Sequence, residues 1–214
     1  MGIYPKDKTM MAVYSHPDDA EVWSGGSIAK WNSMGGISHV VCFSNGDSIR
    51  ENEAKNSASI LGYNLHLISR ICLVTEENIK EISEIINNLT PDILITHYYS
   101  DTHPAHRSTF EIVNSAVIKP WIKNRKPEIF LCSNTYNSLG MSEVFEPTVI
   151  VDISEFIKVK EEAISQHRSQ HVEILKNMSL TQAKSLADRY NKAKYVEGFI
   201  QVPINGKLAN TSLF

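Results

Sequence analysis

Short apolar runs rich in β-branched residues alternate along the chain with stretches in which apolar residues recur at helical spacing. This alternation is typical of a parallel β-sheet covered by helices. Strands are expected at 10–15, 37–44, 65–68, 92–97, 129–133, 148–153 and 199–202. Helices are expected between the first two strands, at 48–61, at 76–89, after Pro104, from Ser154 into the 170s and from Ser179 onward. The pattern therefore predicts an α/β fold with a mostly parallel sheet and helices on both of its faces.

Several residues mark where these helices begin. Ser48 with Glu51, and Ser179 with Gln182, have the spacing of capping boxes, so each serine is expected at a helix N-cap. Pro104 is expected at the first position of a helix, where its missing N–H would have no partner in any case.

Three other features are better explained by structure than by chemistry. The glycine pair 25–26 belongs to neither a Walker nor a GxGxxG pattern, and close packing of a helix on the sheet explains it better. The Lys- and Glu-rich residues 158–162 are expected on a solvated helix face. His167 is expected on a helix surface.

Composition narrows the classes of protein. With 214 residues, 42% hydrophobic and 21% charged, the chain is expected to form one domain over residues 1–214, because no repeat or linker divides it. The formal net charge of −3 gives no electrostatic reason to expect a nucleic-acid partner. No apolar run approaches the roughly 18 residues that span a bilayer, so membrane insertion is not expected. The odd number of cysteines without a CxxC pair fits a reducing compartment. We therefore expect a cytoplasmic protein, with its oligomeric state open to a homo-oligomer.

Polar residues gather directly after two of the expected strands. The first cluster is HPDDAE at 16–21, and the second comprises His97 and the stretch 101–107, DTHPAHR. In an open parallel sheet, ligands bind beyond the carboxyl ends of the strands, where the strand order reverses. If the first and fourth strands flank that point, both clusters face one crevice.

The types of residue in these clusters indicate a metal site. His16 and Asp19 can turn toward one point, and His106 can supply a third ligand. Two imidazoles and one carboxylate with an open fourth position are a common arrangement of catalytic zinc, although other divalent ions use the same donors. We therefore expect one Zn²⁺ per chain. Asp18 and His103 remain beside the metal, where a carboxylate can accept a proton from water and an imidazolium can stabilise negative charge.

A purely structural explanation is also open. The acidic residues of the first cluster could merely favour a helix N-terminus, at about 0.3–1 kcal/mol each. His103 and His106 could be ordinary residues at the start of a helix. However, capping does not require three histidines within ten residues, so the two clusters together favour a site.

The two clusters, with the glycine pair 25–26, resemble the motifs of the PIG-L/LmbE-type deacetylases. Members of that family are zinc-dependent hydrolases that remove acetyl groups from N-acetylglucosamine-like sugars. Weaker similarities lie at 50–54 (RENEA), at 61–62 and at 160–170. The resemblance covers most of the chain, and it implies a Rossmann-like fold.

The resemblance also implies roles for individual residues. The zinc ligands would be His16, Asp19 and His106. Asp18 would be the general base, and His103 would stabilise the tetrahedral intermediate. Arg50 falls where the family often places an arginine that contacts the substrate.

One position departs from the family pattern. Where the family often has HPDH, this chain has Ala105 in place of the aspartate. A carboxylate within reach of His103 would raise the pKa of that histidine and keep it a hydrogen-bond donor. We hypothesise that Asp101 replaces the missing carboxylate, or that the enzyme works with a less strongly charged His103.

Taken together, the residues predict a zinc-dependent hydrolase that removes an acetyl group from an N-acetylated amino sugar or its conjugate. In that reaction Asp18 would take a proton from the attacking water and deliver it to the leaving amine. Two alternatives stay open. One is a sugar-binding or accessory protein of the same fold with weakened catalysis, and the other is a zinc esterase at the same site.

Overall fold

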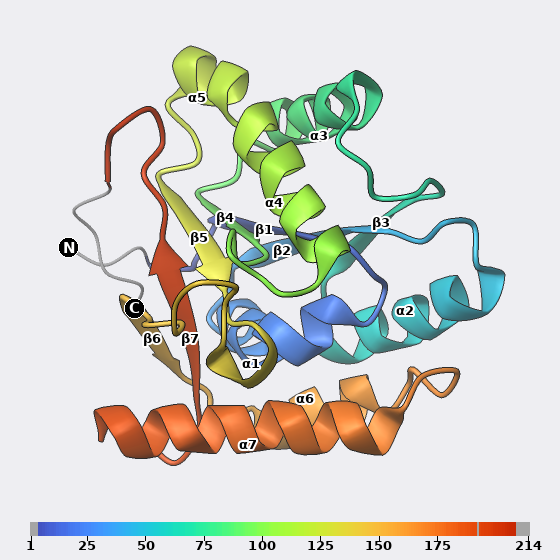
Figure 1. Cartoon of the computed structure of the whole chain (residues 1–214), viewed down its shortest axis with the longest axis vertical. Coiled ribbons are helices and arrows are strands. Elements are labelled where there is room, and N and C mark those ends of the chain that lie inside the picture. The colour runs from blue at the N-terminus through green and yellow to red at the C-terminus, as the bar shows by residue number, and fades with distance from the viewer. Residues whose placement is uncertain (1–3, 192, 209–214) are drawn as a thin grey trace.

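Seven strands form one sheet in the order β3-β2-β1-β4-β5-β7-β6 in the computed structural model, which describes residues 4–191 and 193–208 (Figure 1). The strands are β1 Thr9–Tyr14, β2 Ile37–Phe43, β3 Asn64–Ile68, β4 Ile93–Thr96, β5 Ile129–Ser133, β6 Val149–Asp152 and β7 Val196–Gln201. The first five strands are parallel to one another, whereas β7 is antiparallel to both β5 and β6. The sheet is thus mostly parallel and Rossmann-like, as predicted.

Helices cover both faces of the sheet (Figure 1). They are α1 Asp19–Ser33, α2 Ser48–Leu61, α3 Glu76–Leu89, α4 Pro104–Ala116, α5 Ile118–Asn124, α6 Ile157–Ile164 and α7 Val172–Tyr190, with a 3₁₀ turn, η1, at Tyr136–Ser138. One core lies between the sheet and the helices α1, α2, α6 and α7, and the other lies under α3, α4 and α5.

Strand β1 shows why the strands of this sheet are continuous apolar runs in the sequence. Successive side chains of β1 point to opposite faces, so Ala12 packs into the first core and Val13 into the second. Because both faces are covered, both positions must be apolar. Ala12 pairs with Val40 of β2 and Ile95 of β4, so β1 is an interior strand of the sheet.

Both predicted capping boxes are wrong. The carboxylate of Asp47, not Ser48, caps α2, since it accepts hydrogen bonds from the backbone N–H groups of Ile49 and Arg50. The second pair lies inside α7 rather than at its start. The Ser179 hydroxyl donates to the Val22 carbonyl, and the Gln182 amide donates to the Thr135 carbonyl. These side chains bind distant segments, which a local motif does not predict. Pro104 does begin α4.

The expected close packing of α1 is found at one glycine of the pair, Gly26. A Cβ atom at Gly26 would lie 2.7 Å from Cβ of Ile153, the residue after β6. At Gly25 the nearest atom would be Cγ of Lys160, at 3.4 Å. Only Gly26 is therefore required by the closeness of the packing.

The expectation of a solvated helix face at 158–162 is wrong for Lys160. It is 2% exposed, and its ammonium donates to Oε1 of Glu197 at 2.6 Å and to the Val22 carbonyl at 2.8 Å. The Glu197 carboxylate also accepts hydrogen bonds from the backbone N–H groups of Gly26 and Ser27. Because α6 lies against α1, this lysine of a charged stretch is buried in an ion pair.

The described part of the chain carries two further features that bear on the predictions from composition. Its three cysteines are buried and free. None of its helices combines the length and the hydropathy that crossing a membrane requires.

Candidate metal centre and active site

The two polar clusters meet at the carboxyl ends of β1 and β4. The strand order reverses between these two neighbours, because β1 continues to β2 on one side and β4 lies on the other. Residues 15–18 join β1 to α1, and residues 97–103 join β4 to α4. The predicted juxtaposition is therefore present at the switch point of the sheet, where open α/β proteins bind ligands.

His16, Asp19 and His106 face one point. Ligand atoms of these three residues all lie within 4.8 Å of one another. Asp19 stands between the imidazoles, with Oδ2 at 3.1 Å from Nδ1 of His16 and Oδ1 at 3.4 Å from Nε2 of His106. Asp19 and His106 are buried, whereas His16 is partly exposed. The arrangement could hold one cation with access from solvent on the His16 side.

Two N–H groups fix the orientation of Asp19. The backbone N–H of His16 donates to Oδ2 at 2.7 Å, and the Trp23 indole donates to Oδ1 at 3.2 Å. Burial by itself would raise the pKa of Asp19, but the surrounding histidines, foremost His106, hold that pKa well below its usual value. Asp19 is thus a carboxylate ready to bind a cation.

His106 is held by a second carboxylate. Its Nδ1 lies 2.9 Å from Oδ2 of Asp101, while its Nε2 is buried and has no hydrogen-bond partner in the described part of the chain. This pattern assigns a proton to Nδ1 and makes Nε2, which faces Asp19, the ring atom that could bind a cation. Burial lowers the pKa of His106, but Asp19 and Asp101 outweigh it and raise that pKa to about 9. The site therefore favours a positive charge at this ring.

The hypothesis that Asp101 acts on the His103 ring is not supported by the contacts. Oδ1 of Asp101 accepts the backbone N–H of His103 at 2.7 Å, which turns Oδ2 toward His106. Nδ1 of His103 is buried without a hydrogen-bond partner. Burial and the neighbouring His106 lower the pKa of His103. The second possibility, a less strongly charged His103, agrees better with this geometry.

Asp18 lies beside the cluster and is paired with Arg50. Nη2 of Arg50 donates to Oδ1 of Asp18 at 2.5 Å. The arginine reaches this position from the first turn of α2, whose N–H groups are capped by Asp47. Burial and the adjacent Asp19 carboxylate raise the pKa of Asp18, and Arg50 opposes them only in part. The carboxyl of Asp18 is therefore suited to exchange a proton.

His97 faces the same centre, and the sequence analysis assigned it no role. Its Nε2 accepts the backbone N–H of Ser15 at 3.0 Å and lies 3.2 Å from Oδ2 of Asp19. Its ring stacks on that of His106, with centroids 3.7 Å apart. Burial and His106 lower its pKa to about 4, so His97 is neutral. The signal in the sequence that could have indicated this role was the position of His97 at the end of the fourth expected strand.

His167 is fully buried, so its expected place on a helix surface is wrong. Its Nε2 lies 3.3 Å from Oε2 of Glu21, and the other oxygen of Glu21 accepts hydrogen bonds from the hydroxyls of Ser57 and Tyr63. Two residues on, Ser169 donates its N–H and its hydroxyl to the Glu53 carboxylate at 2.7 and 2.6 Å. Helices α1 and α2 thereby anchor the segment between α6 and α7.

A pocket of about 340 Å³ opens beside the cluster. It is lined by His16, Asp18, Asp19, Val22, Trp23, Arg50, His103, Tyr136, Gln170, His171, Ile174, Leu175 and Met178. Five of the seven residues predicted for the site line this pocket. The other two, His106 and Asp101, are fully buried behind it. The contribution of α7 could not be expected from the sequence, because nothing local indicates that this helix returns to the site.

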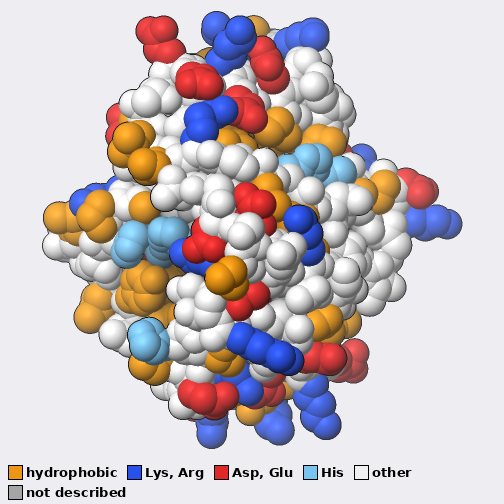
Figure 2. Space-filling view, turned by 90° about the vertical axis from the view of Figure 1, so that its right-hand side faces the viewer, with side chains coloured by type: hydrophobic (Ala, Val, Ile, Leu, Met, Phe, Trp, Pro, Cys, Tyr) orange, Lys and Arg blue, Asp and Glu red, His pale blue; other side chains and the backbone are white. Residues whose placement is uncertain are grey.

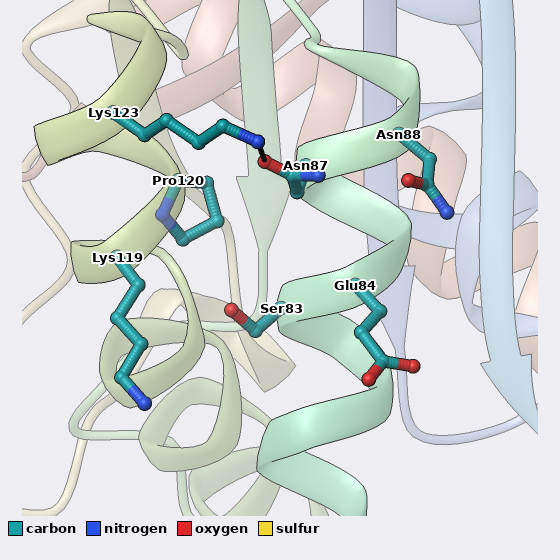
Figure 3. A pocket seen from close by; sticks show the side chains of 7 residues that line it. All are labelled: Ser83, Glu84, Asn87, Asn88, Lys119, Pro120 and Lys123. Atoms are coloured by element: carbon teal, nitrogen blue, oxygen red, sulfur yellow. Dashed lines mark hydrogen bonds between the residues drawn. The ribbon is translucent and has the colours of Figure 1, made fainter.

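A second hollow of about 380 Å³ lies between α3 and α5 (Figure 3). Its lining includes Ser83, Asn87, Lys119 and Lys123, and Lys123 donates to the Asn87 side chain at 3.2 Å. None of the predicted site residues lines it. Its size alone therefore does not make it the functional site.

The fold and the clustered donors define a class of protein: a Rossmann-like α/β protein with a candidate His/Asp metal site at the switch point of its sheet. Comparison with family models shows which family of this class the chain belongs to. The family model described as PIG-L, GlcNAc-PI de-N-acetylase, matches residues 11–117, half of the 214 residues, and that segment contains both clusters. The chain belongs to the PIG-L family. It is a deacetylase, that is a hydrolase, of small amino-sugar-like substrates.

Two relatives agree with this assignment, and a solved structure agrees with the fold. A probable N-acetyl-α-D-glucosaminyl L-malate deacetylase of Bacillus anthracis is 25% identical over 189 residues, covering 77% of this chain and 82% of the relative. A diacetylchitobiose deacetylase of Thermococcus kodakarensis is 26% identical over 224 residues, covering 92% and 84%. The crystal structure of GalB, a 4-carboxy-2-hydroxymuconate hydratase of Pseudomonas putida KT2440, superposes with a TM-score of 0.77 at 19% identity, covering 91% and 96%. At that identity the last similarity shows the fold alone.

Proposed function

We propose that this protein removes the acetyl group from an N-acetylated amino sugar, or from a conjugate of one, with the help of one zinc ion. The observation that carries the proposal is the buried Nε2 of His106, which has no hydrogen-bond partner and faces Asp19 and His16. Two carboxylates favour positive charge at this ring, and a bound cation would supply it. The donor set fits zinc, and other first-row divalent ions can bind the same atoms.

The proposed ligands are His16, Asp19 and His106. When bound by two imidazoles and a carboxylate, zinc lowers the pKa of a water ligand to about 7 and polarises a carbonyl group. Asp101 acts on His106 as a positioning residue, because its hydrogen bond to Nδ1 keeps Nε2 available as a ligand.

Asp18 is the proposed proton carrier. Its carboxylate accepts a proton from the attacking water, and the protonated carboxyl then delivers this proton to the leaving amine. Arg50 holds Asp18 at the pocket and limits the rise of its pKa, so that the carboxylate form stays accessible. Arg50 lines the same pocket, which also suits the predicted contact with the substrate.

His103 is the proposed group at the developing oxyanion. Its ring lies 5.1 Å from that of His16 and 4.6 Å from that of His106, measured between centroids, and it lines the pocket. With a lowered pKa it would act as a neutral N–H donor. Among the described residues, no carboxylate forms a hydrogen bond with this ring, which favours weak catalysis and makes the sugar-binding protein the second candidate.

The proposal can be tested by metal analysis of the purified protein together with an assay of amine release from N-acetylglucosamine and its glycosides. Asp18→Asn should keep the metal and lower kcat by about 10²–10⁴-fold. The matched control is Asp188→Asn, at an exposed position of α7, which should match the wild type. Near-full activity of metal-loaded Asp18→Asn would contradict the assignment. Sugar binding without amine release would support the second candidate, and turnover of esters alone would support a zinc esterase.

A further inference from the structure

We infer that the amino sugar recognised by this protein carries an uncharged, apolar substituent, such as an aryl or alkyl group, which packs on Ile174, Leu175 and Met178 of α7. The inference rests on the proposed function, because it concerns the substrate of the same pocket. The observation that supports it is that the pocket has one polar wall and one apolar wall.

One wall carries the polar groups of the proposed chemistry. The other consists of Trp23 and Tyr136 and, beyond them, of the three α7 residues, which alone we call the apolar wall. The Trp23 and Tyr136 rings meet edge to face with centroids 5.2 Å apart, and Tyr136 also stacks over His106. These two aromatic residues therefore lie beside the metal ligands, where the sugar ring would sit. The apolar wall begins beyond them.

The apolar wall is partly exposed, in contrast to the later turns of α7. Ile174 is 65% exposed, while Leu175 and Met178 are partly buried against the core under α1. Farther along the same helix, the side chains of Ala183, Leu186 and Ala187 are buried. Figure 2 shows that exposed hydrophobic side chains gather beside histidine side chains on one part of the molecular surface. An apolar group bound at this wall would remove its surface from water, which is favourable in proportion to the area covered.

The wall is also held in place before any substrate binds. Ser169 is fixed to Glu53 by two hydrogen bonds, and His167 lies against Glu21, immediately before α7 begins. The segment is thus tied to α1 and α2, which carry Asp18, Asp19 and Arg50. A preformed wall costs little ordering on binding.

The charges in the pocket disfavour an anionic substituent. Among the described residues that line it, Arg50 is the single lysine or arginine, and it is already paired with Asp18. The side chains of the apolar wall are uncharged, so a phosphate or carboxylate placed on them would have no permanent counter-charge there. His171 also lines the pocket, but an imidazole lacks the permanent charge of arginine. Arg168 lies in the adjoining open groove, which it lines together with Glu173.

The test compares three substrates that share the N-acetylglucosamine ring: the benzyl glycoside, the methyl glycoside and the 1-phosphate. For the wild type, kcat/KM should be about tenfold higher for the benzyl than for the methyl glycoside, the scale on which apolar pockets discriminate. Ile174→Ser should remove most of this preference by raising KM for the benzyl glycoside, with a much smaller change of kcat/KM for the methyl glycoside. Met178→Thr should act in the same direction. Ile122→Ser, at a 57% exposed position of α5 away from the pocket, is the matched control.

Equal kcat/KM values for the two glycosides, a preference for the 1-phosphate, or an equal loss on both glycosides in Ile174→Ser would each overturn the inference. Failure of the proposed function is distinguished by measuring binding of the benzyl and methyl glycosides of glucosamine, which have no acetyl group to lose. Tighter binding of the benzyl compound, abolished in Ile174→Ser, supports the wall even if no acetyl group is released. Indistinguishable binding refutes it whether or not deacetylation occurs.

Discussion

The two neighbouring glycines of α1 should respond in opposite ways to the same substitution. Replacing a helical glycine by alanine stabilises a helix by about 0.8–1 kcal/mol when the methyl group has room. At Gly25 the new Cβ would be 3.4 Å from Cγ of Lys160 and 3.5 Å from Cδ1 of Leu61, which are ordinary contacts. Gly25→Ala should therefore be neutral or raise the free energy of unfolding by up to about 1 kcal/mol.

At Gly26 the new Cβ would be 2.7 Å from Cβ of Ile153 and 2.8 Å from its Cγ2 and Cδ1. Cβ is attached directly to the backbone, so a rotamer change of Ile153 cannot relieve the clash and the helix must move. Overpacking of this kind costs about 1–3 kcal/mol. Because the gain in helix propensity is common to both variants, the difference between them isolates the cost of overpacking.

Urea unfolding of both variants and the wild type, in the presence of a chelator so that metal binding adds nothing, measures this difference. We expect equal m-values, with Gly26→Ala less stable than Gly25→Ala by about 1–3 kcal/mol. Two variants of equal stability would refute the conclusion that α1 and Ile153 are in closest possible contact at Gly26.

Two further predictions follow from other parts of the molecule. Asp101→Asn removes the charge behind His106, so metal affinity should fall by about 10–100-fold, measured by competition with a chelator; unchanged affinity would remove Asp101 from the site. The second prediction concerns His39 and His66, whose ring nitrogens Nδ1 and Nε2 lie 2.9 Å apart. Burial lowers the pKa of both histidines, and the neighbouring His66 lowers the pKa of His39 further. The unfolded chain therefore binds protons at these two histidines more readily than the folded chain does. For this reason the protein is more stable above the unfolded pKa of about 6.5 than below it, and this stability is lost as the pH falls through that value. In His66→Gln the loss of stability between pH 7.5 and pH 5 should be smaller than in the wild type; identical losses would contradict the assignment.

The sequence by itself determined the α/β class, the position of every strand to within a few residues and the two polar clusters. These properties depend on local periodicity and on residues that follow one another, such as HPDD after β1. Parallel strands place their carboxyl ends at one edge, so the meeting of His16 and His106 could also be anticipated.

Only the tertiary structure decided what the side chains touch. Lys160 looked solvated and is buried against Glu197, and His167 looked exposed and lies against Glu21. Asp101 turned out to hold His106 rather than the His103 ring. The apolar wall of α7 has no local signature near the clusters. In each case the partner lies on a different element, and the packing of helices against one another, not the spacing of residues along the chain, sets the contact.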